Sequence, residues 1–529
     1  MGKIKKSVVF KEYTPGQLLL LPPSLEELIP QAHLVRVVNQ VVERMDISEL
    51  INLYEGGGTS AYHPRMLLKV LLYAYCMKIY TGRKIACALA QDIHFFWLSG
   101  MSRPDFRTIN RRSGARFRSG KAKDAIQVLF SSMLVFLMEH GYIRMENYFC
   151  DGSTFSADAN KHKMVWKKNA QRYKASAEQK CRQLLKEIDA LNAVEDAAYG
   201  NKDLEEYGPG PISQQVIADQ IEQLNEKVKG LTSKKTKRKA QGLGKKLAQA
   251  ADRARQYDDQ IQTAGARSGY NLTDPDASAI MMKNKVEVLP AYNVLAGCED
   301  QFITGISLHQ NTHDGTCFKE HVTQISAQQP APVENIIADS IFGTEENYEL
   351  LENKGINSYL KFPWFHGEQK KKYQNTPFLK DNFHYDTAWD TYTCPNNQTL
   401  SLQRSCKQTH KRTGYQSQIK EYECSSCAGC PFYERCCKSE QGANRIIKVN
   451  QKLDNYKQQA RVNLNSQKGF QLRKQRSIEI ETCFGDIKAN MGFRRFHLRG
   501  LKKVTAEFTL VAMAHNLRKL HLKQQKAAA

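Results

Sequence analysis

Apolar residues at helical spacing dominate the first part of the chain. An amphipathic helix is predicted by five apolar residues that repeat every three or four positions: Leu34, Val37, Val38, Val41 and Val42. Three more helical segments with short links follow between residues 63 and 118, and a further apolar helix is expected from Ala125 to His140. This pattern predicts a helical N-terminal domain that spans residues 1–145.

At Tyr148 the spacing changes to the alternation that is typical of strands. The first strand is expected to end near Asp151, and a hairpin is expected to turn at Glu299 and Asp300. Helices then alternate with strands up to about residue 362, which indicates an α/β fold.

This α/β core is divided along the chain. Its first part is expected at residues 146–162 and 266–380, and C-terminal helices in residues 446–529 would complete it. One of these helices contains Arg476, and the other is predicted to be amphipathic from Val504 to Leu522.

Residues 163–265 interrupt the core with apolar residues that step by three and four positions, as in a coiled coil. Three runs show this spacing: Cys181, Leu184, Ile188 and Leu191, then Ile217, Ile221, Leu224, Val228 and Leu231, and finally Leu247, Ala250, Ala254, Tyr257 and Ile261. A basic run at residues 234–239 lies between the last two. We therefore expect an inserted antiparallel helical arm with a positive tip, which either contacts DNA or remains a solvent-exposed coiled coil.

The composition adds a strong positive charge to this picture. Of the 529 residues, 77 are Lys or Arg and 54 are Asp or Glu, which gives a net charge of +23. Such an excess implies an acidic partner, usually nucleic acid, and a merely solvated basic surface is the alternative. No apolar run is long enough to span a membrane and no export signal is visible, so we expect a cytoplasmic protein.

Arginines cluster on the last of the three helical segments between residues 63 and 118, which together resemble a helix-turn-helix DNA reader. Arg107, Arg111 and Arg112 are the candidates for DNA contact. They lie on several sides of the helix, which favours contact with phosphates over reading of bases. A helical bundle with a solvated basic face is the alternative.

Seven cysteines gather between residues 394 and 437, within a cysteine-rich insert at residues 381–445. Cytoplasmic cysteines stay reduced, so a local cluster indicates a metal site before disulfides. The spacing is typical of a structural Zn²⁺ site with four thiolates, and an iron–sulfur cluster is the competing interpretation. Four ligands are expected from this set: Cys394, Cys424, Cys427, Cys430 and Cys436. Five other cysteines are expected in the core: Cys76, Cys87, Cys150, Cys181 and Cys298.

Acidic residues at strand ends are the strongest chemical signal. Asp151 and Asp339 each follow a predicted strand, and carboxylates at strand ends emerge at one edge of a sheet. With a third carboxylate from a helix, they could hold two Mg²⁺ ions, or Mn²⁺ in their place, for displacement at a phosphodiester. His313 and Asp314 could lie near this site, but they are expected to cap the helix that follows them.

Four stretches of the chain carry a family resemblance: DGSTFSADANK, YNVLAGCEDQFITG, IIADSIFGTEENYELL and IEIETCFGDIKANMGFRRFHLRGLKKV. With them, the chain resembles DDE/D transposases of bacterial insertion sequences, most closely the IS1182-type branch of the IS4/IS5-like group. The helical first domain and the cysteine-rich insert match too. The resemblance implies an RNase H-like core in which Asp151 and Asp339 are the first two catalytic acids, on its first and fourth strands.

The same family pattern selects the third catalytic acid. It places a glutamate three residues before an aromatic residue and seven before a lysine, and Glu481 meets both conditions whereas Glu479 does not. The pattern also has an arginine four residues before the glutamate, where this chain has Ser477 with Arg476 beside it. The resemblance therefore implies Glu481 as the third acid and metal ligand, with Glu479 as the alternative.

Basic residues follow the third acid along the same segment. Lys488 would contact a DNA phosphate near the cut, or form a salt bridge within its helix instead. Arg494, Arg495 and Arg499 would bind the DNA backbone at the same end, contacts that fix position and not sequence.

These signals together predict a cut-and-paste DNA transposase. It would nick the ends of its insertion sequence and join the freed 3′-hydroxyl groups to target DNA. Double-stranded DNA would be its partner, as terminal inverted repeats and as target, and a homodimer would hold the two ends in the cytoplasm at the bacterial nucleoid. A catalytically inactive DNA-binding relative and a plain RNase H-like endonuclease are the alternatives.

Overall fold

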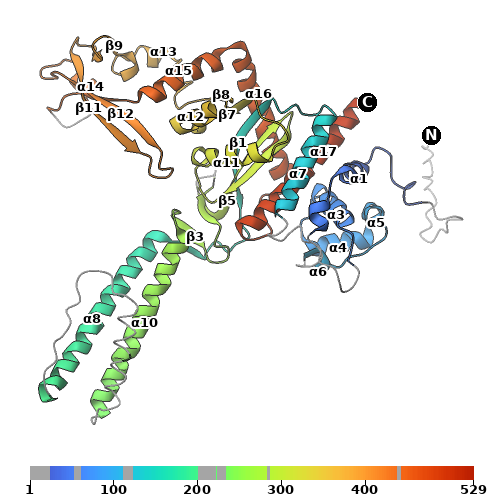
Figure 1. The fold of residues 1–529 in the computed structure, drawn as a ribbon, viewed down its shortest axis with the longest axis horizontal. Helices are drawn as coiled ribbons and strands as arrows, with labels where there is room; N and C mark the ends of the chain where they lie inside the picture. Colours follow the sequence, from blue (N-terminus) through green and yellow to red (C-terminus); the bar gives the residue numbers. More distant parts are fainter. Residues whose placement is uncertain are drawn as a thin grey trace, which may run out of the picture.

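The structure is a computed structural model that describes residues 24–52, 61–110, 123–199, 222, 234–282, 286–437 and 442–528. A central sheet is covered by helices, and a helical N-terminal part, a long two-helix arm and a second sheet surround it (Figure 1). The predicted α/β class is confirmed. None of the helices in the described part of the chain combines the length and the apolar character that crossing a membrane requires.

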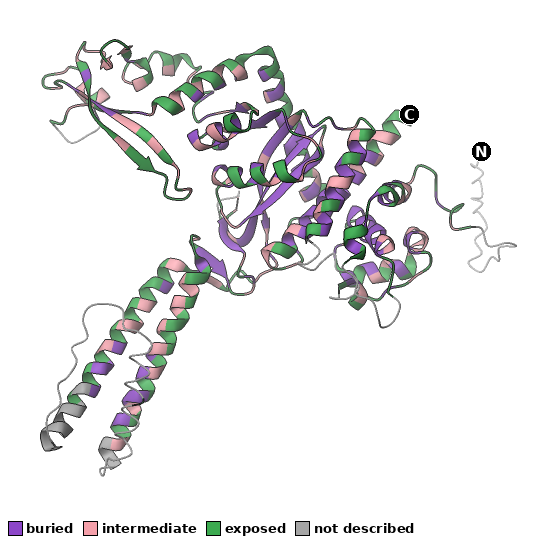
Figure 2. Ribbon diagram, viewed as in Figure 1, coloured by how far each residue is buried: buried purple, intermediate pink, exposed green. Residues whose placement is uncertain are grey.

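Five strands form the part of the central sheet that matters for function: β1 (Asn147–Ser156), β5 (Val288–Glu299), β6 (Phe302–His309), β7 (Asn335–Ala338) and β8 (Asn357–Leu360). The predicted hairpin is present, since β5 and β6 pair antiparallel across a two-residue turn. β1 pairs antiparallel with β5 and parallel with β7, which in turn pairs parallel with β8. Helices cover both faces, so β6 and β7 are buried along their whole length (Figure 2).

The first strand is longer than predicted. It was expected to end near Asp151, but β1 continues to Ser156, so this prediction is wrong. Gly152 to Ser156 pair with residues 291–295 of β5, which supplies the backbone hydrogen bonds that keep the small polar residues extended. Asp151 therefore lies inside a strand, whereas Asp339 directly follows the end of β7 as expected.

Helices from the middle and the end of the chain cover the sheet. α11 (Asp314–Gln328) and α12 (Glu345–Asn353) follow the strands, and α16 (Gln467–Gly485) and α17 (Leu501–Ala528) return from the C-terminal part. α17 was predicted to be amphipathic, but every residue from Ala506 to Leu517 is buried. The reason is that α17 packs against β6 on one side and against N-terminal helices on the other, so no polar face is left there.

The N-terminal helices are α1 (Leu34–Arg44), α2 (Ser48–Ile51), α3 (Pro64–Cys76), α4 (Gly82–Gln91), α5 (Ile93–Ser99), α6 (Phe106–Asn110) and α7 (Lys123–Glu139). α1 and α7 confirm the predicted helices, and the apolar residues of α1 are buried. These helices join the C-terminal part of the chain: α3 packs on α17, and the hydroxyl of Tyr80 donates to the carbonyl of Met491 at 2.7 Å.

The arm extends from the edge of the central sheet (Figure 1). It consists of α8 (Lys167–Tyr199) and α10 (Lys234–Ala264), framed by the short strands β2 (Met164–Trp166), β3 (Gly269–Asn271) and β4 (Ser278–Met281). Two of the three predicted apolar runs meet between the helices, where Cys181, Leu184, Leu185 and Ile188 pack against Ala240, Leu243, Leu247 and Ala250. The remaining run, from Ile217 to Leu231, lies outside the described residues.

The second sheet contains the cysteine-rich insert. Its strands pair antiparallel in the order β13-β12-β11-β10-β9. They are β9 (His384–Asp386), β10 (Thr391–Thr393), β11 (Thr399–Thr409), β12 (Gln416–Cys424) and β13 (Ile446–Val449). The short helices α13 (Lys371–Gln374) and α14 (Tyr433–Cys436) flank it, and α15 (Gln451–Asn465) leads back to α16.

A glycine of β5 makes room for a buried tyrosine of β1. A methyl group added at Gly297 would overlap the ring of Tyr148, which is 1% exposed and whose hydroxyl lies 2.8 Å from Nε2 of His321. Gly297→Ala is therefore expected to lower the free energy of unfolding by about 1–3 kcal/mol, because the tyrosine has no space to yield. Urea unfolding measures this change. Gly242→Ala is the control, since nothing lies near the added carbon in α10, and a loss of equal size there would contradict the steric explanation.

Candidate active site

α16 passes across the central sheet and presents the predicted third acid. The helix begins after Ser466, whose side chain accepts a hydrogen bond from the backbone N–H of Gly469. It packs on β1, β5 and β7 and passes into a π-helical turn, η5 (Asp486–Asn490). Such turns interrupt helices often at functional sites.

Three carboxylates meet around one arginine of this helix. Nη1 of Arg476 lies 3.4 Å from Oδ2 of Asp151, and its Nη2 lies 3.6 Å from Oδ2 of Asp339 and 3.7 Å from Oε1 of Glu481. The arginine side chain is 9% exposed, whereas those of Asp339 and Glu481 are 44% and 56% exposed. A buried guanidinium thus holds together three acids that open to the surface. We call these four residues the acid cluster.

The two aspartates meet because of strand register. β1 and β7 run parallel, and their last paired residues are Cys150 and Ala338, so Asp151 and Asp339 occupy the next positions of neighbouring strands. Lys361, directly after β8, places its ammonium group 3.8 Å from Oδ1 of Asp339. Burial lowers the pKa of Lys361, and the nearby Asp339 carboxylate opposes that shift.

Glu479 points away from the acid cluster. Its side chain is buried, Oε2 accepts a hydrogen bond of 2.5 Å from the backbone N–H of Gln301, and Oε1 accepts one of 3.1 Å from Gln475. Burial raises its pKa. Two residues along a helix correspond to a rotation of about 200°, so Glu479 and Glu481 face opposite sides. The geometry brings Glu481, and not Glu479, to the two aspartates.

The acid cluster has the donor chemistry that a divalent ion prefers. Carboxylate oxygens from three elements suit Mg²⁺, a hard cation that takes oxygen ligands. Among the described residues, no group of three or more His, Cys, Asp or Glu side chains is arranged as metal ligands. In the acid cluster, the Arg476 guanidinium lies between the three carboxylates. The residues therefore fit a magnesium site once the arginine moves aside.

Asp314 is a further acid close to β1. Its Oδ1 accepts a hydrogen bond of 2.6 Å from Nδ2 of Asn293, and a side chain at Gly152 would overlap its carboxylate. Successive residues of a strand face opposite sides, so Asp314 lies across the sheet from the side chain of Asp151. His313 occupies the N-cap position of α11 but makes no capping bond with its side chain. The place of Asp314 beside Gly152 is not predictable from the sequence, because nothing local reveals the neighbours of Gly152.

The predicted DNA-contact residues are dispersed. Nζ of Lys488 donates to Oγ of Ser153 at 2.7 Å and to the carbonyl of Thr154 at 2.8 Å, which ties it to β1. Arg495 and Arg499 are about half exposed, and both bind the carboxylate of Asp158.

The other predicted arginines lie elsewhere. Nε of Arg494 donates to the carbonyl of Lys488 at 3.0 Å. Arg107 lies over the ring of Phe106 in the N-terminal helices. Arg111 and Arg112 lie outside the described residues.

Six cysteines of the second sheet line one small cavity: Cys394, Cys424, Cys427, Cys430, Cys436 and Cys437. All five predicted ligands are among them. The thiols of Cys394 and Cys427 accept hydrogen bonds from the backbone N–H groups of Asn396 and Arg445, at 3.4 and 3.3 Å. We call these six residues the thiol cluster.

The remaining cysteines correct one expectation. Cys76, Cys150, Cys181 and Cys298 are buried as predicted. Cys87 is exposed, because it lies on the outer side of α4, where its thiol donates to Oε1 of Gln91.

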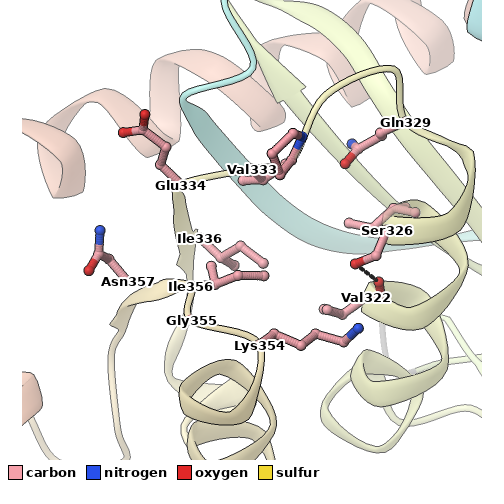
Figure 3. A pocket seen from close by; sticks show the side chains of 12 residues that line it. Val322, Ser326, Gln329, Val333, Glu334, Ile336, Lys354, Gly355, Ile356 and Asn357 are labelled. Carbon is pink, nitrogen blue, oxygen red and sulfur yellow. Dashed lines mark hydrogen bonds between the residues drawn. The ribbon is translucent and has the colours of Figure 1, made fainter.

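A cavity of about 480 Å³ lies at the other end of the central sheet (Figure 3). Val322 and Ser326 of α11 line one side of it, and Val333, Ile336 and Ile356 lie at the amino ends of β7 and β8. Asp339 follows the carboxyl end of β7, so this cavity is separate from the acid cluster.

Comparison with protein families identifies two domains. A family model described as "Transposase DDE domain" matches residues 393–521, and one described as "Transposase domain (DUF772)" matches residues 23–114. The combination is typical of IS1182-family transposases, which confirms the resemblance, and a DDE transposase domain implies an RNase H-like core. The first match contains Glu481, whereas Asp151 and Asp339 lie between the two matches. Searches of curated proteins and of solved structures find no match.

Proposed function

We propose that this DNA transposase nicks the ends of its own insertion sequence and joins the resulting 3′-hydroxyl groups to target DNA. The observation that carries the proposal is the meeting of Asp151, Asp339 and Glu481 around Arg476, in a chain that also contains two transposase domains. The chemistry would be a two-metal displacement at a phosphodiester.

The protein's own residues would organise that reaction. Asp151 and Asp339 would supply oxygen ligands from neighbouring strands, and Glu481 would supply them from the exposed side of α16. When bound, two Mg²⁺ ions would activate the attacking oxygen and stabilise the leaving one. Arg476 offsets one of the three negative charges, and once it moved aside for the metal it would contact the phosphate that is cut.

DNA would be held by basic residues at several places. We assign backbone contact to Arg494, Arg495 and Arg499, which follow η5 along the chain, and to Arg107, Arg111 and Arg112 of the N-terminal part. Lys488 would act indirectly, because its bonds to Ser153 and Thr154 steady the strand that carries Asp151.

Two ends of one element must be brought together, so we propose a homodimer on DNA, with the arm holding DNA or the second subunit. We also propose that the protein acts in the bacterial cytoplasm, at the nucleoid, because its target is chromosomal DNA.

The test is a Mg²⁺-dependent assay on DNA that carries the terminal inverted repeats of the element. Cleavage followed by a strand-transfer product supports a transposase. Specific binding without any cleavage would favour an inactive DNA-binding relative, and cleavage without joined product would favour a plain endonuclease. Asp339→Asn is the matched control, since it removes one charge from the acid cluster at nearly constant size.

The thiol cluster would hold a structural Zn²⁺ ion through four of Cys394, Cys424, Cys427, Cys430 and Cys436. Support comes from their common cavity and from the backbone N–H groups that bond to two of the thiols, as expected around metal-bound thiolates.

Elemental analysis is expected to find about one zinc per chain, and Cys427→Ser is expected to lower both the zinc content and the melting temperature, because metal binding contributes to folding. Cys406→Ser is the control, since Cys406 lies on β11 outside the cavity. Iron with visible absorption in its place would contradict zinc.

A further inference from the structure

A groove of about 440 Å³ lies between the π-helical turn after α16 and the helix α17. Gly485 and Asp486 line it from one side, His515, Arg518 and Lys519 from the other, and Gln301 of the β5–β6 turn closes its floor. We call it the α16–α17 groove. None of its residues belongs to the acid cluster.

His515 carries a positive charge at the base of this groove. Its Nδ1 lies 2.8 Å from Oδ2 of Asp486, and its Nε2 lies 3.0 Å from the carbonyl oxygen of Gln301. Both neighbours are acceptors, so both ring nitrogens must donate, and a ring with two N–H groups is an imidazolium. The charge is buried, since His515 is 3% exposed.

Two further cations make the groove an anion site. Arg518 donates from Nη1 to the carbonyl of Cys76 at 3.0 Å, and Lys519 binds the side-chain oxygen of Gln301. Among the described residues, the one acid that lines the groove is Asp486, and it is already engaged by His515, by Nδ2 of Asn490 and by Nη2 of Arg518 at 4.0 Å. Three cations against one carboxylate leave the groove with an excess of two positive charges.

The groove also lies next to the acid cluster along the same helix. Gly485 follows Glu481 by four residues, which is a rise of about 6 Å on the same exposed side of α16. A DNA strand whose scissile phosphate reaches Glu481 and which continues past Gly485 would bring a neighbouring phosphate to the mouth of the groove.

We propose that the α16–α17 groove binds a phosphodiester of the DNA next to the bond that is cut, through Arg518 and Lys519 over the charge of His515. This inference rests on the proposed transposase function. It adds a second phosphate site to the one at the acid cluster, on the side of α16 that faces the β5–β6 turn, where the backbone N–H of Gln301 also binds Glu479.

Lys519→Gln tests the groove through the salt dependence of DNA binding. Each lost phosphate contact makes the slope of log K against log salt concentration less negative by about 0.9, and the affinity at moderate salt is expected to fall about three- to tenfold. Lys523→Gln is the matched control one helical turn later, because Lys523 lies over the ring of Phe302 and does not line the groove. Equal slopes for Lys519→Gln and the wild type would overturn the proposal.

Gly485 offers a second test that removes no existing contact. A carbon added there meets nothing within 4 Å, so a side chain is tolerated. Gly485→Glu places a negative charge at the mouth of the groove and is expected to weaken DNA binding about tenfold, whereas Gly485→Gln, of the same size, is expected to bind like the wild type. If both variants bind DNA equally, no phosphate occupies the groove and the proposal fails.

Inorganic phosphate distinguishes DNA from a free anion as the ligand. Stabilisation of the wild type by phosphate, lost in Lys519→Gln but without any change in DNA affinity, would overturn the assignment to DNA. If the wild type cleaves DNA and all groove variants bind DNA with unchanged affinity, the groove is not a phosphate site, and the proposed function is unaffected. Conversely, if the groove variants change the salt dependence of DNA binding but the protein never cleaves DNA, the groove is a DNA contact and the proposed catalytic function is wrong.

Discussion

Replacing Glu481 with glutamine is expected to lower the rate of Mg²⁺-dependent DNA cleavage by about 10³-fold, a loss of about 4 kcal/mol of transition-state stabilisation. The substitution removes one of three charged ligands while it keeps the size of the side chain. Glu481 is 56% exposed and projects from the surface of α16, so the fold has little need of it. Single-turnover cleavage of terminal-repeat DNA, with binding measured separately, shows whether the chemical step alone is lost.

Glu479→Gln is the matched comparison on the same helix. Its glutamine retains an acceptor for the backbone N–H of Gln301, and it removes a buried carboxyl group whose pKa is raised by burial. We expect cleavage within about tenfold of the wild type, since the side chain faces away from the acid cluster. Loss of cleavage in Glu479→Gln with activity retained in Glu481→Gln would reverse the assignment of the third acid.

Replacing Asp486 with alanine is expected to cost about 3–5 kcal/mol of folding free energy, because it leaves the imidazolium of His515 buried without its carboxylate. Asp486 accepts hydrogen bonds from His515 and from Asn490, and its loss would strand both donors. Urea unfolding near neutral pH measures the change. Asp454→Ala is the control, since Asp454 makes its ion pairs with lysines at the surface, where such pairs contribute about 0–1 kcal/mol.

The pH dependence of stability is an independent test of the ion pair between His515 and Asp486. Burial alone would lower the pKa of His515, but the Cys483 thiolate and the Asp486 carboxylate raise it to about 10. A pKa raised above its usual value near 6.5 contributes stability that is complete below about pH 6.5 and is lost as the pH rises toward 10. Cys483, whose pKa is lowered to about 6, offsets this loss up to about pH 9, because the unfolded thiol then carries the proton that folded His515 holds. The wild type should therefore lose stability from about pH 9 upward, and Asp486→Ala should lose less. Parallel curves for the two proteins would contradict a charged His515.

Local patterns in the sequence predict a helix or strand correctly where its position depends on its own residues. The helical spacing of apolar residues located α1 and α7, and the alternation around Glu299 and Asp300 located the β5–β6 hairpin. They are less reliable where the end or the burial of an element depends on a segment distant in the sequence. The end of β1 was misplaced because its last residues are extended by pairing with β5, and α17 is buried on all sides because helices from the start of the chain cover it.

The acid cluster shows the same division. Positions within short motifs and a family resemblance identify Asp151, Asp339 and Glu481 without any distance between them. The role of Arg476 was not apparent, since its five-residue separation from Glu481 departs from the expected spacing, and only the side-chain geometry places its guanidinium among all three acids.

By itself, the sequence determined the class of fold, the basic character that implies DNA, and the residue types that the chemistry requires, because these depend on composition and on spacing within single elements. Only the tertiary structure decided which glutamate faces the aspartates and which cations share a groove with His515. Those relations depend on strand register, helix rotation and packing between segments hundreds of residues apart, and the physical reason is that a side chain acquires its charge, partners and exposure from neighbours that the chain brings together only on folding.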